Sequence, residues 1–110
     1  MSVRDLIIQR PETDRAVVSL IGDHDSFSAD RVAREVRALL DEGFDVQINL
    51  RDATFVDSTT VGVLIEAHRY ARASGRGFTV VIGETTGWAV RRLFELTQLD
   101  SFLTLSADGS

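Results

Sequence analysis

The chain has 110 residues, a formal net charge of −5 at pH 7, 44% hydrophobic residues and 26% charged residues. This length suits one domain with its own hydrophobic core, and the composition is that of an ordered globular protein. The negative charge opposes binding to nucleic acid and to anionic membranes. Cysteine is absent and all 12 basic residues are Arg, which excludes disulfides, thiol nucleophiles and lysine Schiff bases.

No run of the sequence approaches the ~20 apolar residues that a membrane-spanning helix needs. The first residues carry a short apolar run but no small-residue cleavage site, so no signal peptide is predicted. We expect one cytoplasmic domain over residues 1–110, with a core at about 3–105 and a polar tail at 106–110.

Two strands are predicted at the start of the chain. Apolar residues at Leu6–Ile8 predict a first strand, which Pro11 is expected to end. The β-branched run at 16–21 predicts a second, buried strand that ends at Gly22.

Helices and strands alternate in the rest of the chain. From Ser28 the apolar residues recur at helical spacing, which predicts a helix with Ser28 as its N-cap and Gly43 as its stop. Apolar and polar residues then alternate over 45–50, as in a strand. The later segments predict a polar loop at 51–62, anchored by Phe55 and Val56, and a helical face over 61–75. A strand at 78–82, a helix at 88–97 and a short strand at 102–105 are predicted to follow. This order favours an α/β domain with a mostly parallel sheet.

Few residues are suited to catalysis. His24 and His68 do not fall at a metal-ligand spacing, and His68 lies on the apolar stripe of its helix, where a packed side chain is expected. No glycine-rich nucleotide loop and no nucleophile elbow is present in the sequence. The sequence therefore predicts no metal site, no cofactor and no enzymatic activity.

The most informative segment is the hydroxyl-rich run Asp57-Ser58-Thr59-Thr60, at a junction between a strand and a helix. Asp, Ser and Thr are preferred N-caps because their oxygens accept the unpaired N–H groups of a first helical turn. A hydroxyl there is also a place where phosphate would add about −1.5 to −2 charges beside a positive helix end. Both a cap and a modification site fit this pattern.

Residues 55–64, Phe-Val-Asp-Ser-Thr-Thr-Val-Gly-Val-Leu, resemble the signature of the STAS family, the domain of bacterial anti-sigma factor antagonists. In that family the hydroxyl two places after the Asp is phosphorylated by a partner kinase. The resemblance implies Thr59 as the acceptor, with Ser58 as second choice. It also implies a STAS-type α/β single domain, with a mixed, mostly parallel sheet of about four or five strands and about three or four helices.

Other segments extend this resemblance over nearly the whole chain. Residues 22–29, 49–55 and 89–97 are similar to the family's strand-to-helix junction, its strand before the acceptor loop and its last helix. Three positions depart from the family pattern: His24 replaces an apolar residue, and Thr60 and Gln98 each replace a Gly. The β-branched side chain of Thr60 is expected to narrow the access of a kinase to Thr59.

The resemblance implies a partner-switching regulator. The unmodified protein would bind an anti-sigma factor of the serine-kinase type, phosphorylation would end the binding, and a phosphatase would restore it. ATP and Mg²⁺ would be held by the kinase. The residues expected to contact the partner are Asp23, Asp25, Ser28, Asp57, Ser58, Thr60 and Val61.

A second hypothesis is a STAS module without phosphorylation, acting as a scaffold or as a subunit of a membrane transport complex. Neither hypothesis requires nucleic-acid binding or direct membrane insertion. The sequence leaves open whether the protein is a monomer or a homodimer and whether Trp88 is buried or contacts a partner. We also expect Gly62 to permit close packing of the second helix, so that a larger side chain there would destabilise the fold.

Overall fold

The computed structural model describes residues 4–82 and 104–106. In chain order the elements are β1 (Arg4–Glu12), β2 (Arg15–His24), α1 (Ser26–Asp41), β3 (Asp45–Asn49), β4 (Ala53–Val56), α2 (Ser58–Ala73), β5 (Phe78–Val81) and β6 (Thr104–Ser106). The helix expected at 88–97, with Trp88, and the position of Gln98 lie outside the described residues.

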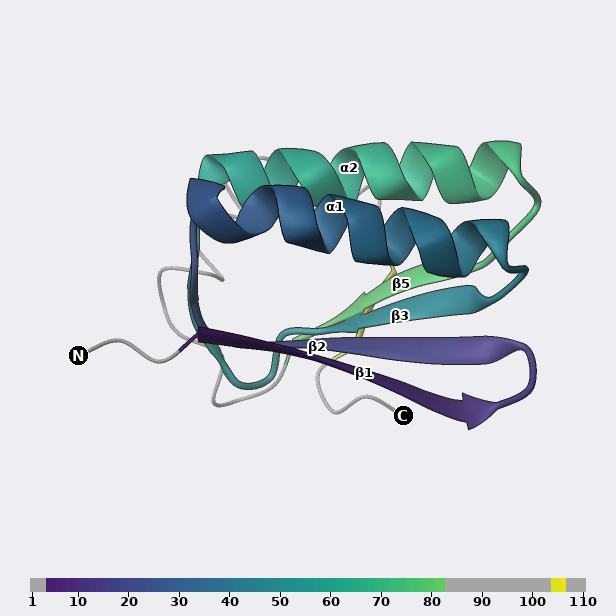
Figure 1. Cartoon of the computed structure of the whole chain (residues 1–110), viewed down its shortest axis with the longest axis horizontal. Helices are drawn as coiled ribbons and strands as arrows, with labels where there is room; N and C mark the ends of the chain where they lie inside the picture. The colour runs from purple at the N-terminus through teal and green to yellow at the C-terminus, as the bar shows by residue number, and fades with distance from the viewer. Residues whose placement is uncertain (1–3, 83–103, 107–110) are drawn as a thin grey trace.

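The strands form one mixed sheet in the order β1-β2-β3-β5-β6, with β4 paired to β2. The β1–β2 pair is antiparallel, whereas β2–β3, β2–β4, β3–β5 and β5–β6 are parallel. Helices α1 and α2 lie side by side over one face of this sheet (Figure 1). The predicted α/β architecture with a mostly parallel sheet is confirmed.

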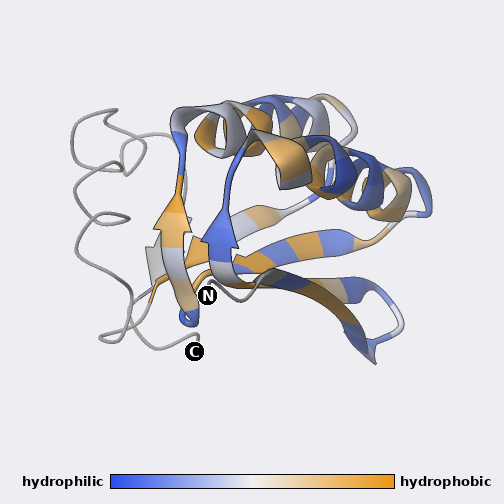
Figure 2. Cartoon of the chain, turned by 60° about the vertical axis from the view of Figure 1, so that its left-hand side comes forward, coloured by the Kyte–Doolittle hydropathy of each residue, from blue (hydrophilic) through white to orange (hydrophobic). Residues whose placement is uncertain are grey.

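The core lies between the sheet and the two helices. Alternate residues of β2 are buried, as expected for a strand that turns one side toward the helices. Both helices carry interspersed hydrophobic and polar positions (Figure 2), the pattern of amphipathic helices. The residues of the core with the largest fully buried apolar side chains are Leu20, Leu39, Ile48, Leu50, Leu64, Val18, Val32, Val36, Val56 and Val80.

Two expected strand ends were wrong. The first strand continues through Pro11 to Glu12, and its register with β2 shifts between Gln9 and Glu12. Proline is tolerated there because β1 is an edge strand and needs fewer backbone donors. Gly22, with a φ of 80°, marks a second register shift, after which β2 continues to His24. These shifts bend the strands without ending them.

The expectation of a polar loop at 51–62 was wrong, because this segment contains β4, Ala53–Val56, and the start of α2 at Ser58. This strand continues the path of β3 along β2: β3 pairs with the first half of β2, and β4 pairs with its last residues. Only Ala53 and Val56 are buried in β4, so its sequence has no clear period of two. The strand matters because it carries the chain to Asp57 beside the end of β2.

Glycine ends both helices as predicted. Gly43 has a φ of 98° and Gly75 a φ of 72°, the left-handed conformation in which Gly carries no steric penalty. After α1, the N–H of Gly43 donates to the carbonyl of Leu40, and the N–H of Phe44 donates to that of Leu39. This hydrogen-bond pair is a Schellman motif, which satisfies the last carbonyls of the helix.

Gly62 does not have the packing role expected from the sequence. It lies inside α2, and a Cβ added there would meet no atom of residues 4–82 or 104–106 within 4 Å outside its own helix. Against the described elements, the expectation that Gly62 permits close packing of this helix is therefore wrong.

Gly43→Ala and Gly62→Ala make the same chemical change in opposite settings. Gly43→Ala should destabilise the protein by about 1 kcal/mol, because Ala strains the left-handed backbone. Gly62→Ala should stabilise it by up to about 1 kcal/mol, because Ala favours a helix interior. Urea unfolding of the two variants beside the wild type measures both changes. Equal effects of the two substitutions would contradict this assignment.

Candidate functional site

Two strand-to-helix junctions lie side by side at one end of the molecule. Asp23 pairs with Phe55 and His24 pairs with Val56 across β2 and β4. The N–H of Asp57 then donates to the carbonyl of His24 at 3.1 Å, so the pairing continues to the last residue before α2. The two helices consequently begin together at the left in Figure 1.

An aspartate caps each of the two helices. Asp25 Oδ1 accepts a hydrogen bond from the N–H of Phe27 at 3.0 Å, and Asp57 Oδ1 accepts one from the N–H of Thr60 at 2.9 Å. The expectation that Ser28 caps the first helix is wrong, because the N-cap is Asp25, three residues earlier, and the helix begins at Ser26. Two carboxylates thus stand at two positive helix ends, a favourable electrostatic arrangement.

His24 is buried beneath these caps, with 1% of its surface exposed. Its Nε2 lies 3.0 Å from the carbonyl oxygen of Asp5 and 3.1 Å from that of Ile21. Because carbonyl oxygens only accept hydrogen bonds, this nitrogen carries a proton. Its Nδ1 lies 3.0 Å from Ser28 Oγ, so the ring joins β1, β2 and the first turn of α1. His24 is therefore a hydrogen-bonded core residue.

Thr60 does not obstruct the proposed phosphate acceptor. Its side chain is fully buried, and its Oγ1 lies 3.5 Å from the carbonyl oxygens of both His24 and Asp25. The side chain therefore points inward, toward the other junction. The expectation that Thr60 narrows the access to Thr59 is wrong, because the two side chains point in different directions: Thr59 is exposed.

The residues predicted to act together form an outer and an inner group. Ser58 and Thr59 are exposed, and Asp23, Asp25 and Asp57 are half-buried at the surface. The inner group, with buried side chains that support the junctions from within, is Ser28, Thr60 and Val61. Only the outer group can contact a partner directly without a rearrangement of the fold.

Two exposed aromatic residues at the same end were missed by the sequence analysis. Phe27, in the first turn of α1, is 85% exposed, and Phe55, which was expected to anchor a loop, is 43% exposed. Neither position stands out in the sequence, because an aromatic residue in a helix or a strand is usually assigned to the core. The surface formed by the outer group and these rings is called the junction face below: Asp23, Asp25, Phe27, Phe55, Asp57, Ser58 and Thr59.

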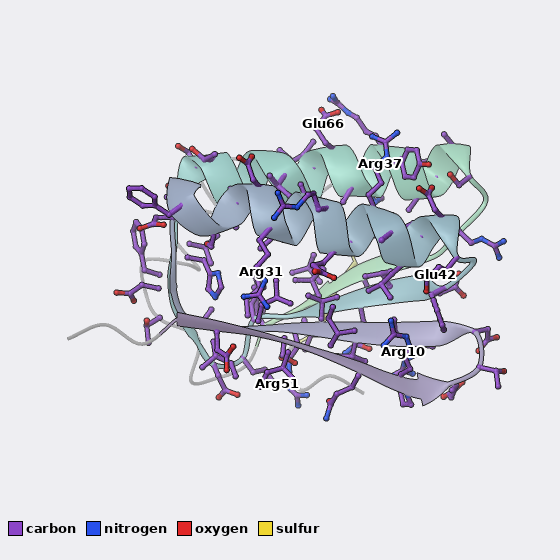
Figure 3. All side chains as sticks on the ribbon, viewed as in Figure 1. Arg10, Arg31, Arg37, Glu42, Arg51 and Glu66 are labelled. Atoms are coloured by element: carbon purple, nitrogen blue, oxygen red, sulfur yellow. The ribbon has the colours of Figure 1, made fainter. Side chains whose placement is uncertain are left out.

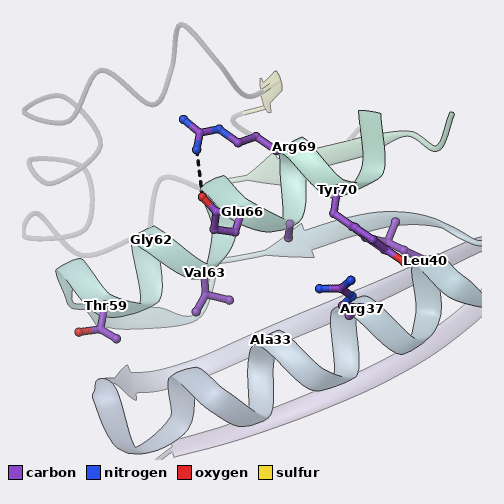
Figure 4. A pocket seen from close by; sticks show the side chains of 10 residues that line it. Ala33, Arg37, Leu40, Thr59, Gly62, Val63, Glu66, Arg69 and Tyr70 are labelled. Atoms are coloured by element: carbon purple, nitrogen blue, oxygen red, sulfur yellow. Dashed lines mark hydrogen bonds and ion pairs between the residues drawn. The ribbon is translucent and has the colours of Figure 1, made fainter. Parts of the chain in front are cut away.

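A groove with a volume of about 740 Å³ runs from the junction face along the outer side of α1 and α2. Thr59 lies at the start of α2 at one end of the groove, and Val63 follows along its wall (Figure 4). Arg37 and Glu66 project from the outer side of the helix pair (Figure 3). At the far end the guanidinium of Arg37 lies 4.1 Å from the centre of the Tyr70 ring. The groove thus extends the surface around Thr59.

His68 is a packed helix residue, as predicted. It is half-buried, and its ring centre lies 6.1 Å from that of Phe78. Burial, and to a lesser extent the positive charge of Arg72, lower the pKa of His68 below the ordinary value of 6.5. His68 lies on α2 nine residues after Thr59 and is not part of the junction face.

Within residues 4–82 and 104–106, no group of three or more His, Asp or Glu side chains is arranged to hold a metal ion. No helix in the same part of the chain is long and apolar enough to cross a membrane.

A family model described as "Mlab, STAS domain" matches residues 8–105. The chain belongs to the STAS domain family. The fold described above is the one shared by solved members. The expectation that came from residues 55–64 is therefore confirmed at the level of family and fold.

Several known proteins that are similar to this chain in sequence or structure are anti-sigma factor antagonists. The anti-sigma-B factor antagonist of Bacillus subtilis is 28% identical over 90 residues, which cover 82% of this chain and 80% of that protein. An anti-sigma factor antagonist from Mycobacterium paratuberculosis has a TM-score of 0.81 at 24% identity, covering 94% and 86% of the two chains. SpoIIAA has a TM-score of 0.79 in its unphosphorylated form (16% identity, 94% and 90% covered) and 0.73 in its phosphorylated form (14% identity, 94% and 93% covered).

Asp57→Ala and Asp57→Asn distinguish two contributions of Asp57 to stability, the hydrogen bond that caps α2 and the negative charge of the carboxylate. The alanine variant should lose about 1 kcal/mol of stability, because the N–H of Thr60 loses its acceptor. The asparagine variant keeps an acceptor oxygen and should stay within a few tenths of a kcal/mol of the wild type. Urea unfolding at neutral pH is the measurement. An asparagine variant as unstable as the alanine variant would show that the charge, not the cap, is what stabilises this turn.

The lowered pKa of His68 predicts a pH dependence of stability. Between that lowered pKa and 6.5 the unfolded chain binds more protons than the folded protein. Stability should therefore fall as the pH decreases through this window and should be independent of His68 above it. Unfolding of the wild type and of His68→Gln from pH 8 to about pH 5 tests this. The same slope in both proteins would contradict it.

Proposed function

We propose that this protein is an anti-sigma factor antagonist that works by partner switching. In its unmodified form the junction face binds an anti-sigma factor of the serine-kinase type. Phosphorylation of Thr59 ends that binding, and a phosphatase restores it. The protein acts in the cytoplasm as a binding regulator and not as an enzyme, and the partner kinase supplies ATP and Mg²⁺. The resemblance of residues 55–64 to the family signature and the descriptions of the relatives support this proposal.

The observation that carries the proposal is the arrangement of the three hydroxyl residues after Asp57. Thr60 is buried and binds the neighbouring junction, whereas Ser58 and Thr59 are exposed. A kinase can therefore reach Thr59, or Ser58 as second choice, without unfolding the turn. The cap on this turn comes from Asp57, so the acceptor hydroxyl is not needed to hold the helix.

The electrostatics of the junction face favour release after phosphorylation. A phosphate brings about −1.5 to −2 charges at neutral pH. On Thr59 it would lie near Asp57 and close to the helix start that Asp25 caps. The positive end of α2 stabilises the phosphate on the protein itself. The surface of the partner that contacts the neutral hydroxyl of Thr59 would then face a strongly hydrated dianion. Removing water from this charge would make the contact unfavourable.

A STAS module without phosphorylation, acting as a scaffold or as a subunit of a membrane transport complex, is the alternative. Its support from the sequence was Thr60 in place of Gly. The buried position of Thr60 removes the steric part of that argument. The phosphorylation experiment below distinguishes the two functions directly.

The decisive experiment incubates the protein with ATP, Mg²⁺ and each anti-sigma-type kinase of the same genome, and measures the intact mass. A gain of one phosphate mapped to Thr59 supports the proposal, and a phosphate on Ser58 keeps the switch but moves its site. If none of the kinases adds a phosphate, the unphosphorylated scaffold or transport subunit becomes the better account.

Substitutions of Thr59 should separate binding from modification. Thr59→Ala should bind the kinase as the wild type does but take up no phosphate, because only the acceptor oxygen is lost. Thr59→Glu should bind about tenfold more weakly or worse, because it places a charge in the contact. Thr13→Glu, in the exposed turn between β1 and β2, is the matched control for an added charge away from the junction face and should bind as the wild type does. Titration calorimetry with the purified kinase gives the affinities, and equal affinities for all four proteins would contradict a switch at Thr59.

A further inference from the structure

Phe27 has no structural role that explains its position. It is the second residue of α1, and its ring is 85% exposed. Its backbone N–H is satisfied by Asp25, a contact that any residue would make. Phenylalanine has only moderate helix propensity, and an exposed aromatic ring leaves a large apolar surface in water. The fold therefore gains nothing from an aromatic side chain here.

The pairing of the two junctions places Phe27 at the level of the acceptor residue. His24 and Val56 are partners across β2 and β4, and each is followed by a capping aspartate and a helix. Phe27 is the second residue of α1, and Thr59 is the second residue of α2. Because the helices are packed side by side and begin together, the exposed ring and the exposed hydroxyl occupy equivalent positions on neighbouring helices.

We propose that Phe27 is the anchor residue of the partner-binding surface, and that its ring enters an apolar pocket of a protein partner whose rim carries Arg or Lys side chains. This inference rests on the proposed function and names the chemistry of the partner at that site. Buried aromatic residues carry much of the binding energy of protein interfaces, and a polar rim around them excludes water. Here the rim consists of carboxylates: Asp25 caps the helix that carries Phe27, and Asp57 caps the neighbouring helix.

The negative charge of the junction face favours a protein partner with a basic rim over two other binding partners, a second copy of this chain and an anionic membrane. A second copy of the chain, joined through the same face, would set Asp25 and Asp57 against their own copies, and like charges disfavour that contact. An anionic membrane surface would be repelled by the same carboxylates. A basic rim on a different protein is the complementary surface, in keeping with the net charge of −5.

The position of Phe27 also explains how a phosphate on Thr59 would act. The ring contributes to binding only if its pocket excludes water. A dianion on the neighbouring helix keeps its hydration shell, and this shell would keep the ring from entering the pocket. Release would follow without any change in the fold.

The test titrates wild type, Phe27→Ala and Ile7→Ala into each anti-sigma-type kinase of the same genome. Ile7 is the matched control, because it is an apolar residue that is 40% exposed on β1 and is not part of the junction face. Phe27→Ala should bind at least about tenfold more weakly, and Ile7→Ala should bind as the wild type does. Phe27→Leu should recover most of the affinity, since an apolar pocket accepts Leu. Thermal unfolding of Phe27→Ala should match that of the wild type.

Each other outcome has a distinct meaning. If the wild type binds a kinase and Phe27→Ala binds it equally well, the anchor is overturned and the proposed function stands. If the wild type binds none of the kinases, the proposed function fails and the anchor fails with it. Sedimentation velocity at increasing protein concentration tests the second copy: a dimer that Phe27→Ala dissociates would overturn the assignment to a different protein.

Discussion

The pairing of the end of β2 with β4 is the constraint on which the functional surface depends. It continues to the hydrogen bond from the N–H of Asp57 to the carbonyl of His24, the last bond before the chain enters α2. That bond aligns two capping aspartates and two helix starts at one end of the sheet. Without this bond, the distance between the charges of Asp25 and Asp57 would not be fixed. The residues that surround Thr59 would not be fixed either. The buried contacts of His24 and Thr60 support the alignment from inside the protein.

This arrangement separates the parts that keep the fold from the parts that bind. His24, Ser28 and Thr60 support the junctions from inside the protein, whereas the hydroxyl and the aromatic ring assigned to binding are exposed on the first turns of α2 and α1. The capping residues Asp25 and Asp57 lie between these two groups, half-buried at the surface. A modification at Thr59 therefore changes the charge of a surface and leaves the core contacts in place.

Much of the fold was predictable because it depends on patterns that the sequence carries directly. The β-branched run in β2, the alternation in β3 and the glycines after both helices predicted their elements correctly. The helical spacing from Val61 predicted α2, which begins earlier, at Ser58. Strand β4 was missed because its buried residues, Ala53 and Val56, stand three positions apart and do not alternate with the exposed ones. The roles of Phe27, Thr60 and Gly62 could not be predicted, since each depends on which neighbour a side chain meets across the packed helices and strands. The motif predicted Thr59 as acceptor, but the equivalent position of Phe27 on the neighbouring helix follows only from the register of β2 and β4.

The central claim is that phosphorylation changes the surface of the protein and not its fold. Amide hydrogen exchange tests this claim most directly, when it is measured along the chain before and after phosphorylation by the cognate kinase. The account predicts unchanged protection in β2, in α1 and in α2 beyond its first turn, with differences confined to the junction face. Loss of protection throughout α2 or β2 in the phosphorylated protein would contradict it, because the modification would then act by unfolding the junctions.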